Sequence, residues 1–196
     1  SERMRAQIRS TGMSRQNVEN GLSMLQTADS WLQKINDMLS RMHELGVEAG
    51  DGTKTTDDLD NIQSEFKELQ SEIRRVTSGT TSAAKYNGLY VFRGGDGSGT
   101  FDDTAGISIQ IGADLGQNVT VDLEKLDAEL GDSTDLDYKD VDGADQTVEW
   151  ASVISSKDTL SVGDTNAIGK IAAAIDHIAN SRATLGAQQN RLKETQ

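Results

Sequence analysis

Apolar residues recur at every third or fourth position along one long stretch near the start of the chain. These residues are Val18, Leu22, Leu25, Ala28, Leu32, Ile35, Leu39, Met42 and Leu45. Such spacing draws one continuous apolar stripe along a helix and leaves its other faces polar. A helix over this stretch is roughly 42 Å long. Its stripe needs helical partners of similar length, because an isolated amphipathic helix is marginal in water.

Two later segments carry matching stripes. The second stripe comprises Leu59, Ile62, Phe66, Leu69, Ile73 and Val76, and the third comprises Ile168, Ile171, Ile175, Ile178, Leu185 and Leu192. Arg182 and Gln189 interrupt the third stripe. Three stripes of compatible period predict a mainly α protein: a rod of long antiparallel helices, packed like a coiled coil, with a small β-hairpin region.

Glycine, threonine and aspartate residues mark the expected ends of these helices. The first helix is expected to end within the cluster Gly46, Gly50 and Gly52. Thr55 or Thr56 is expected to cap the second helix, whose first turn is rich in aspartate. The third helix is expected to start at Asp164.

The pattern changes to strict alternation in the middle of the chain. Ile107, Ile109 and Ile111 alternate with polar residues, as do Val119, Val121 and Leu123, which predicts an antiparallel hairpin over residues 105–123. Before it, Tyr86–Phe92 is predicted as a short strand that contains the turn pair Asn87–Gly88, followed by a glycine-rich loop at Gly94–Gly99. Residues 124–163 are acidic and weakly patterned, with a short strand expected at Thr147–Ile154.

The formal net charge of −13 lies entirely in this middle region. Residues 93–164 hold 17 acidic and 4 basic residues, whereas the rest of the chain holds 15 of each. An acidic surface argues against nucleic acid as a partner, because the phosphate backbone requires the opposite charge. The chain has no cysteine, so it has no disulfides or thiolate metal sites, and the lack of proline suits long unbroken helices.

Neither a signal-peptide pattern nor an apolar run long enough to cross a bilayer occurs in the sequence. We therefore expect a soluble chain with no membrane partner. Both ends fall within predicted helices, which favours a fragment cut through helices at both termini.

One pair on the first helix begins a zinc-protease pattern. His43–Glu44 matches the start of HExxH, but Val47 stands where the second histidine is required. The favoured interpretation is an exposed helical histidine. No set of nucleophile, base and orienting group can be assembled either, so we predict no catalytic residues, no metal site and no cofactor.

The acidic middle region contains part of a calcium-loop pattern. In an EF-hand register set by Gly143, Asp140, Asp142 and Glu149 fall on ligand positions, but Tyr138 occupies the first. A solvated acidic loop is the favoured interpretation.

Elsewhere Met13, Met24 and Trp31 lie off the first stripe. Subunit contact, simple exposure and packing under the hairpin all remain open for them.

Five blocks of the sequence, taken in order, carry a family resemblance. They are QNVENGLSMLQTADSWLQKINDMLSRMHELGVEAGDG, DLDNIQSEFKELQSEIRRV, KYNGLYVF, IQIGAD and SRATLGAQQNRLKET. The first resembles the N-terminal conserved region of bacterial flagellin, the subunit of the flagellar filament. The others resemble its next helix and strand, its hairpin and its C-terminal helix.

This resemblance implies the rod-like D1 region of flagellin. Residues 1–92 and 164–196 would form its helical core with the first strand, and residues 93–163 a β-hairpin plus a short acidic variable region. The resemblance further implies that this sequence lacks the terminal D0 helices, through which the family's subunits polymerise.

The same resemblance implies a secreted, extracellular structural subunit that self-assembles for motility and has no catalytic activity. Its implied partners are other flagellin subunits, export chaperones and the filament cap. The hook–filament junction protein and a secreted surface adhesin of the same export family remain alternatives.

The segment RMHELGV, Arg41–Val47, resembles the flagellin stretch that an animal flagellin-sensing Toll-like receptor grips. The resemblance implies a partner-binding set of Arg41, Glu44, Leu45 and Glu65. Arg41 and Leu45 are four residues apart and so share a helix face. An ordinary solvated flank with Leu45 in the core is the alternative. His43 and Gly46 stand where the family usually has arginine and alanine, which implies weaker binding than that of a typical flagellin.

Overall fold

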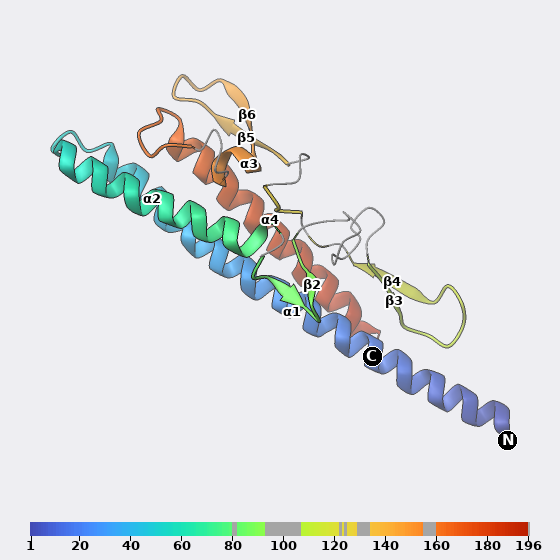
Figure 1. The fold of residues 1–196 in the computed structure, drawn as a ribbon. Coiled ribbons are helices and arrows are strands. Elements are labelled where there is room, and N and C mark those ends of the chain that lie inside the picture. Colours follow the sequence, from blue (N-terminus) through green and yellow to red (C-terminus); the bar gives the residue numbers. More distant parts are fainter. Residues whose placement is uncertain are drawn as a thin grey trace.

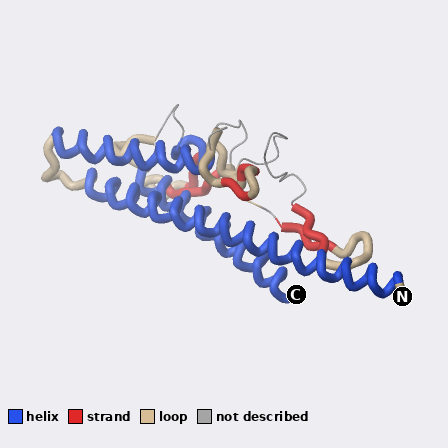
Figure 2. Tube along the Cα trace, turned by 60° about the horizontal axis from the view of Figure 1, so that its bottom comes forward, coloured by secondary structure: helices blue, strands red, loops and turns tan. Residues whose placement is uncertain are grey.

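Long helices lie side by side along one axis in the computed structural model (Figure 1). The structure describes residues 1–79, 82–92, 107–121, 123, 125–128, 134–154 and 160–195. Small β-hairpins flank the helices on one side (Figure 2). The helical rod expected from the three apolar stripes is thus confirmed. The glycine-rich loop expected at Gly94–Gly99 lies outside the described residues.

The first helix, α1 (Glu2–Ala49), runs unbroken over 48 residues. All nine residues of the predicted stripe are buried, which confirms this helix and its inward face. As expected, α1 ends within the glycine cluster: it continues through Gly46 and is capped by Gly50, whose N–H donates to the Val47 and Glu48 carbonyls. Ile168 packs close to Gly46, with its Cγ1 3.4 Å from the position a Cβ would take.

The second helix, α2 (Thr56–Thr77), starts with a reciprocal cap. The Thr55 hydroxyl accepts the Asp58 N–H at 3.2 Å, and the Asp58 carboxylate accepts the Thr55 N–H at 3.0 Å. Both bonds satisfy N–H groups that a helix start leaves without partners. Ile62, Phe66 and Ile73 are buried as expected from the stripe.

The helix α4 (Ala167–Glu194) begins just after the expected start and lies antiparallel to α1, as α2 does (Figure 1). Four residues of its stripe are buried: Ile171, Ile178, Leu185 and Leu192. Where the stripe is interrupted, Ser181 and Gln188 are buried in the same face. The helix α1 packs against both α2 and α4. Among the described residues no helix combines the length and apolarity needed to span a membrane.

The predicted hairpin in the middle of the chain is confirmed. Strands β3 (Ile107–Gln110) and β4 (Asn118–Val121) pair antiparallel, with Ile109 opposite Val119. The hairpin packs on α1 at Gly21, where an added Cβ would overlap Cδ1 of Ile109. A glycine inside a helix costs about 1 kcal/mol relative to alanine, and here it lets the hairpin approach the helix axis.

The single strand expected at Tyr86–Phe92 is instead a very small hairpin. Strands β1 (Lys85–Tyr86) and β2 (Leu89–Tyr90) pair antiparallel across the Asn87–Gly88 turn. Asn87 and Gly88 have φ values of 50° and 79°, the left-handed conformations that a tight hairpin turn requires. The turn pair therefore reverses the chain rather than lying within one strand.

The strand expected at Thr147–Ile154 is only partly correct. Strand β6 (Asp145–Glu149) pairs antiparallel with β5 (Asp135–Lys139), which the sequence analysis did not predict, and the chain then turns into the short helix α3 (Trp150–Ile154). Trp150, Val153 and Ile154 are buried, a spacing of three and four that fits a helix face. Trp150 anchors this region by donating its Nε1–H to the Leu126 carbonyl at 2.8 Å.

Polar side chains of α2 hold the segment that follows α3. Gln70 is buried, and its Nε2 donates to the carbonyls of Val153 and Leu160 at 2.8 Å each. Arg74 donates from Nη1 to the Ile154 carbonyl at 2.6 Å. These bonds satisfy carbonyls that would otherwise be costly to bury, and they fix the outer region against the rod.

Candidate partner-binding surface

Arg41 on α1 joins two glutamates in an ion-pair network on the surface of the rod. Its Nε and Nη2 donate to the two carboxylate oxygens of Glu65 on α2, at 2.8 and 3.2 Å. Its Nη1 donates to Glu44 Oε2, one turn along α1, at 3.0 Å. The side chains of Arg41, Glu65 and Glu44 are 45%, 44% and 66% exposed. The network therefore bridges α1 and α2 in contact with solvent.

Both carboxylates favour the charged guanidinium. The hydrogen bond to Glu65, followed by that to Glu44, raises the pKa of Arg41 above its ordinary value. Arginine is cationic at neutral pH in any case, so the main effect is to hold the guanidinium in one orientation. The network carries one positive and two negative charges, and a partner approaching it meets a fixed guanidinium between carboxylates.

Leu45 does not belong to this surface. It is 1% exposed and packs in the core between the helices. Residues four apart differ by about 40° around a helix, which is enough to place Leu45 on the buried stripe and Arg41 on its solvated flank. The structure therefore brings together three of the four expected residues and removes Leu45 as a direct partner contact.

Three apolar residues near the ends of the long helices are exposed. Val47, Leu59 and Ile168 are 55%, 36% and 42% exposed. Leu59 and Ile168 belong to predicted stripes, but each lies in the first turn of its helix, at the end of the rod, where neighbouring helices cover less of it. The sequence analysis did not single out Val47 as an exposed apolar residue. Its position off the apolar stripe is the signal that could have indicated this exposure.

The three off-stripe residues of α1 have separate environments. Met24 is buried beside the hairpin, next to Ile109 and Tyr86. Trp31 is half-buried, with Lys34 Nζ 4.5 Å from its ring centroid. Met13 is 58% exposed, so of the three it offers the most surface to another molecule.

The histidines lie in separate settings on different helices. His43 is half-buried on α1, and His177 on α4 lies beside Trp150, with ring centroids 6.3 Å apart. Over the described ranges there is no group of three or more histidine, aspartate and glutamate side chains that could hold a metal ion.

The partial calcium-loop pattern forms the turn between β5 and β6. Asp140 Oδ1 accepts the N–H groups of Asp142 and Ala144 at 3.0 and 2.9 Å. The bond from Ala144 is the largest cause that lowers the pKa of the Asp140 carboxyl. Gly143 has a φ of 83°, which a tight turn requires. The solvated acidic loop is thus a hairpin turn held by its own aspartate.

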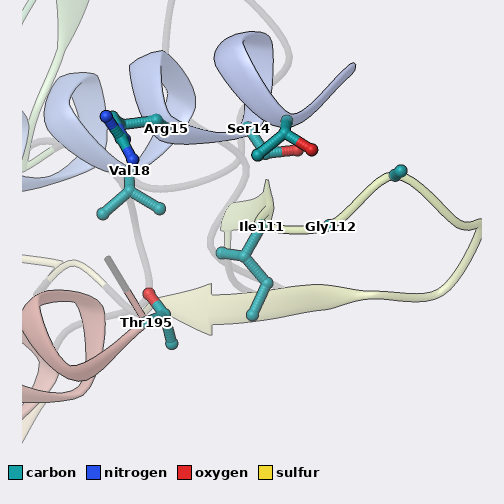
Figure 3. A pocket seen from close by; sticks show the side chains of 8 residues that line it. Ser14, Arg15, Val18, Ile111, Gly112 and Thr195 are labelled. Atoms are coloured by element: carbon teal, nitrogen blue, oxygen red, sulfur yellow. The ribbon is translucent and has the colours of Figure 1, made fainter. Parts of the chain in front are cut away.

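A small cavity of about 110 Å³ lies between α1, the residues after β3 and the end of α4 (Figure 3). Ser14, Val18 and Ile111 line it, together with Thr195. Arg15 is its charged lining residue, so the lining contains no pair of titratable groups for acid–base catalysis.

Comparison with known proteins identifies the family. Residues 1–96 match the bacterial flagellin N-terminal helical region. The whole chain is 32% identical to the flagellin of Bacillus subtilis and 32% identical to the flagellar filament 33 kDa core protein of Treponema phagedenis. The chain belongs to the flagellin family. It spans 65% and 63% of the lengths of these two flagellin-family relatives.

Solved structures share the fold of this chain. Bacillus cereus flagellin has a TM-score of 0.56 at 23% identity, over 92% of this chain and 86% of that one. FliC of Burkholderia pseudomallei has a TM-score of 0.60 at 20% identity, over 87% of this chain and 99% of that one. FlgL of Xanthomonas campestris has a TM-score of 0.62 at 18% identity, over 100% of this chain and 94% of that one. The fold therefore extends beyond proteins named flagellin.

Proposed function

We propose that this chain is a structural subunit of an extracellular bacterial flagellar filament, built for motility and without catalytic activity. The observation that carries this proposal is the similarity along the whole chain to proteins named flagellin and flagellar filament core protein. The long helical rod supports it, because long parallel seams suit side-by-side packing of copies.

The proposal includes the two structural regions expected from the sequence. Residues 1–92 and 164–196 form the helical core with the first strand, and residues 93–163 form a β-hairpin plus a short acidic variable region. The partners of the whole chain are other flagellin subunits, the export chaperones and the filament cap. A hook–filament junction protein or a surface adhesin is the competing function. The flagellin names of the sequence relatives reported above favour the filament.

The test uses the source bacterium. Filaments sheared from the cells and purified should yield peptides of this chain by mass spectrometry, at a level expected of a major subunit. Deletion of the gene should shorten or remove the filaments and abolish swimming, and the restored gene should recover both. If the chain is absent from purified filaments, or confined to the hook junction, the proposed function is wrong.

We further propose that the Arg41 network binds an animal flagellin-sensing Toll-like receptor. The support is the sequence resemblance of the Arg41–Val47 segment, together with the exposed, oriented guanidinium between Glu44 and Glu65. Arginine held in a planar fork is a strong anchor for carboxylate and carbonyl acceptors. Arg41 is the main anchor, and binding is weaker than that of a typical flagellin.

Binding to the receptor ectodomain should be measured for the parent and for Arg41→Ala, with Arg75→Ala as the matched control. Arg75 is an exposed arginine of α2 that pairs with Glu72 of its own helix. Loss of Arg41 should weaken binding roughly tenfold or more, and loss of Arg75 should leave it unchanged. Equal affinities for all three proteins, or no binding by any, would exclude this surface as the receptor site.

A further inference from the structure

The sequence contains two Asn–Gly pairs, Asn20–Gly21 and Asn87–Gly88. Such a pair can react with itself, because glycine has no side chain to shield its amide nitrogen from the side-chain carbon Cγ of the asparagine. By sequence alone the two pairs are equivalent reaction sites. In the folded chain they differ in backbone conformation, hydrogen bonding and accessibility.

The pair Asn20–Gly21 is protected within α1. Each N–H in a helix interior donates to the carbonyl four residues earlier, so the Gly21 nitrogen is engaged in the hydrogen-bond ladder of the helix. Gly21 is also buried, and an added Cβ there would meet Ile109 of the hairpin and Leu192 of α4. Freeing this nitrogen therefore requires α1 and its neighbours to open together, which is a costly event.

The pair Asn87–Gly88 forms the tip of the β1–β2 hairpin. Both residues are exposed, and a Cβ built on Gly88 meets nothing within 4 Å. No hydrogen bond among the described residues uses the Asn87 side chain or the Gly88 N–H. The reacting carbon and nitrogen are therefore both open to water, and neither has to give up a protein partner before it reacts.

The conformation of the turn is the remaining barrier. Asn87 has a φ of 50° and lies in the left-handed region. In that region the nitrogen that follows an asparagine points away from its side chain, so the turn must open before the two atoms can meet. The strands β1 and β2 have two residues each, and a hairpin this small is marginal by itself. Its opening is a local event that costs much less than opening α1.

Two hydrogen bonds limit how often this hairpin opens. At its base the Val91 N–H donates to the Ala84 carbonyl at 3.0 Å. Near its tip the Tyr86 hydroxyl donates to the Asn20 carbonyl on α1 at 3.2 Å. The bond from Tyr86 is exposed to solvent, so water competes for it and it holds the tip against α1 only weakly.

We propose that Asn87 is a site of spontaneous deamidation whose rate is controlled by opening of the β1–β2 hairpin. The Gly88 amide loses its proton, and its nitrogen attacks Cγ of Asn87. A bond forms between this nitrogen and Cγ, the bond between Cγ and Nδ2 breaks, and Nδ2 leaves as ammonia with the proton that the amide lost. The product is a succinimide ring, and no oxidant or reductant is consumed.

Water then opens the ring at one of its two carbonyl carbons. If the bond from the nitrogen to Cγ breaks, the product at position 87 is aspartate. If the bond from the nitrogen to the main-chain carbonyl carbon breaks, the product is isoaspartate, in which the backbone runs through Cγ and gains one carbon. A lengthened turn cannot keep Tyr86 paired with Leu89, so this product should release Tyr86 from α1.

The test is mass spectrometry of tryptic peptides from the 196-residue chain after incubation at mildly alkaline pH. The two asparagines lie on different peptides, residues 16–34 and 86–93. Deamidation replaces an amide NH2 by OH, and the peptide mass rises accordingly. In the folded protein Asn87 should react more than about tenfold faster than Asn20. In concentrated urea both should react at similar rates, because the fold no longer distinguishes them.

Three variants test the mechanism. Asn87→Gln should abolish the product, because glutamine would have to close a larger and less favourable ring. Tyr86→Phe keeps the aromatic ring but removes the bond to Asn20, so the hairpin should open more often and Asn87 should react about two- to fivefold faster. Tyr138→Phe is the matched control, because it removes a tyrosine hydroxyl from the β5–β6 hairpin, and it should react like the parent.

Equal rates at Asn20 and Asn87 in the folded protein would overturn the proposal. An Asn87 that stays unmodified in the folded protein while the urea-unfolded chain reacts would also overturn it. An unchanged rate in Tyr86→Phe, shown by circular dichroism to be folded, would overturn control by the hairpin. The modification goes beyond the proposed filament function, which is tested separately on purified filaments and stands or falls without it.

Discussion

Arg182 on α4 donates a hydrogen bond of 3.0 Å from its Nε to Oδ1 of Asp29 on α1. Arg182 is one of the polar residues that interrupt the third apolar stripe, and its side chain is 33% exposed, against 32% for Asp29. The interruption is therefore a cross-helix ion pair at the edge of the α1–α4 seam.

A double-mutant cycle with Asp29→Ala and Arg182→Ala should give a coupling free energy of about 0.5–1 kcal/mol. The pair is partly exposed, so solvent screens it, and the coupling should fall as salt is added. Chemical denaturation of the four proteins at two salt concentrations measures it. A coupling of zero at low salt would mean that the pair does not hold the helices together.

Phe66→Ala should lower the free energy of unfolding by about 3–5 kcal/mol. Phe66 is fully buried in the middle of the α2 stripe, so the lost ring leaves a cavity between helices. Leu59→Ala is the control, because Leu59 belongs to the same stripe but is 36% exposed, and it should cost much less. Equal shifts in thermal melting for both variants would contradict the α2 register.

Gly186→Ala should stabilise the protein, whereas Gly21→Ala should not. A Cβ at Gly186 meets nothing within 4 Å, so alanine should stabilise the protein by about 0.5–1 kcal/mol through helix propensity. At Gly21 the added Cβ would overlap Ile109 of the hairpin, and the lost packing should cancel or outweigh the same gain. Urea denaturation of both variants measures the difference, and a stabilising Gly21→Ala would show that the hairpin does not pack tightly on α1.

Stability should fall in acid partly through the α2 cap. Hydrogen bonds from Thr55 lower the pKa of the Asp58 carboxyl below its ordinary value of 3.8. A carboxyl whose pKa is lower in the folded state stabilises the fold above its unfolded pKa, and that contribution disappears as the pH falls through the folded pKa.

Thermal melts of the parent and of Asp58→Asn between about pH 5 and pH 2 measure this contribution. Asparagine keeps an acceptor for the Thr55 N–H but cannot titrate, so the variant should lose less stability in acid than the parent. Asp57→Asn, at the neighbouring first-turn position outside the capping box, should follow the parent. Identical acid profiles for the parent and Asp58→Asn would remove the cap as a cause.

Local periodicity predicted the elements well where they are long. The stripes of α1 and α2, the Thr55 start signal and the alternation around Ile109 each act within a few residues and needed no knowledge of the fold. Prediction was weaker at Trp150, where a strand turns directly into a helix, and at Asn87, where two-residue strands are too short to show a period. The strand β5 was also missed, because only two inward residues, Leu136 and Tyr138, alternate with its acidic residues, and so short an alternation does not stand out in an acidic stretch.

The sequence by itself determined the helices, their inward faces and the family to which the chain belongs, because these depend on residue spacing along the chain. The tertiary structure alone decided which residues beside each stripe are covered. It placed Leu45 in the core while Arg41 remained in solvent with Glu65, and it paired Arg182 with Asp29. Those outcomes depend on which neighbouring helix or hairpin packs at each level, and residue spacing in one helix carries no information about that.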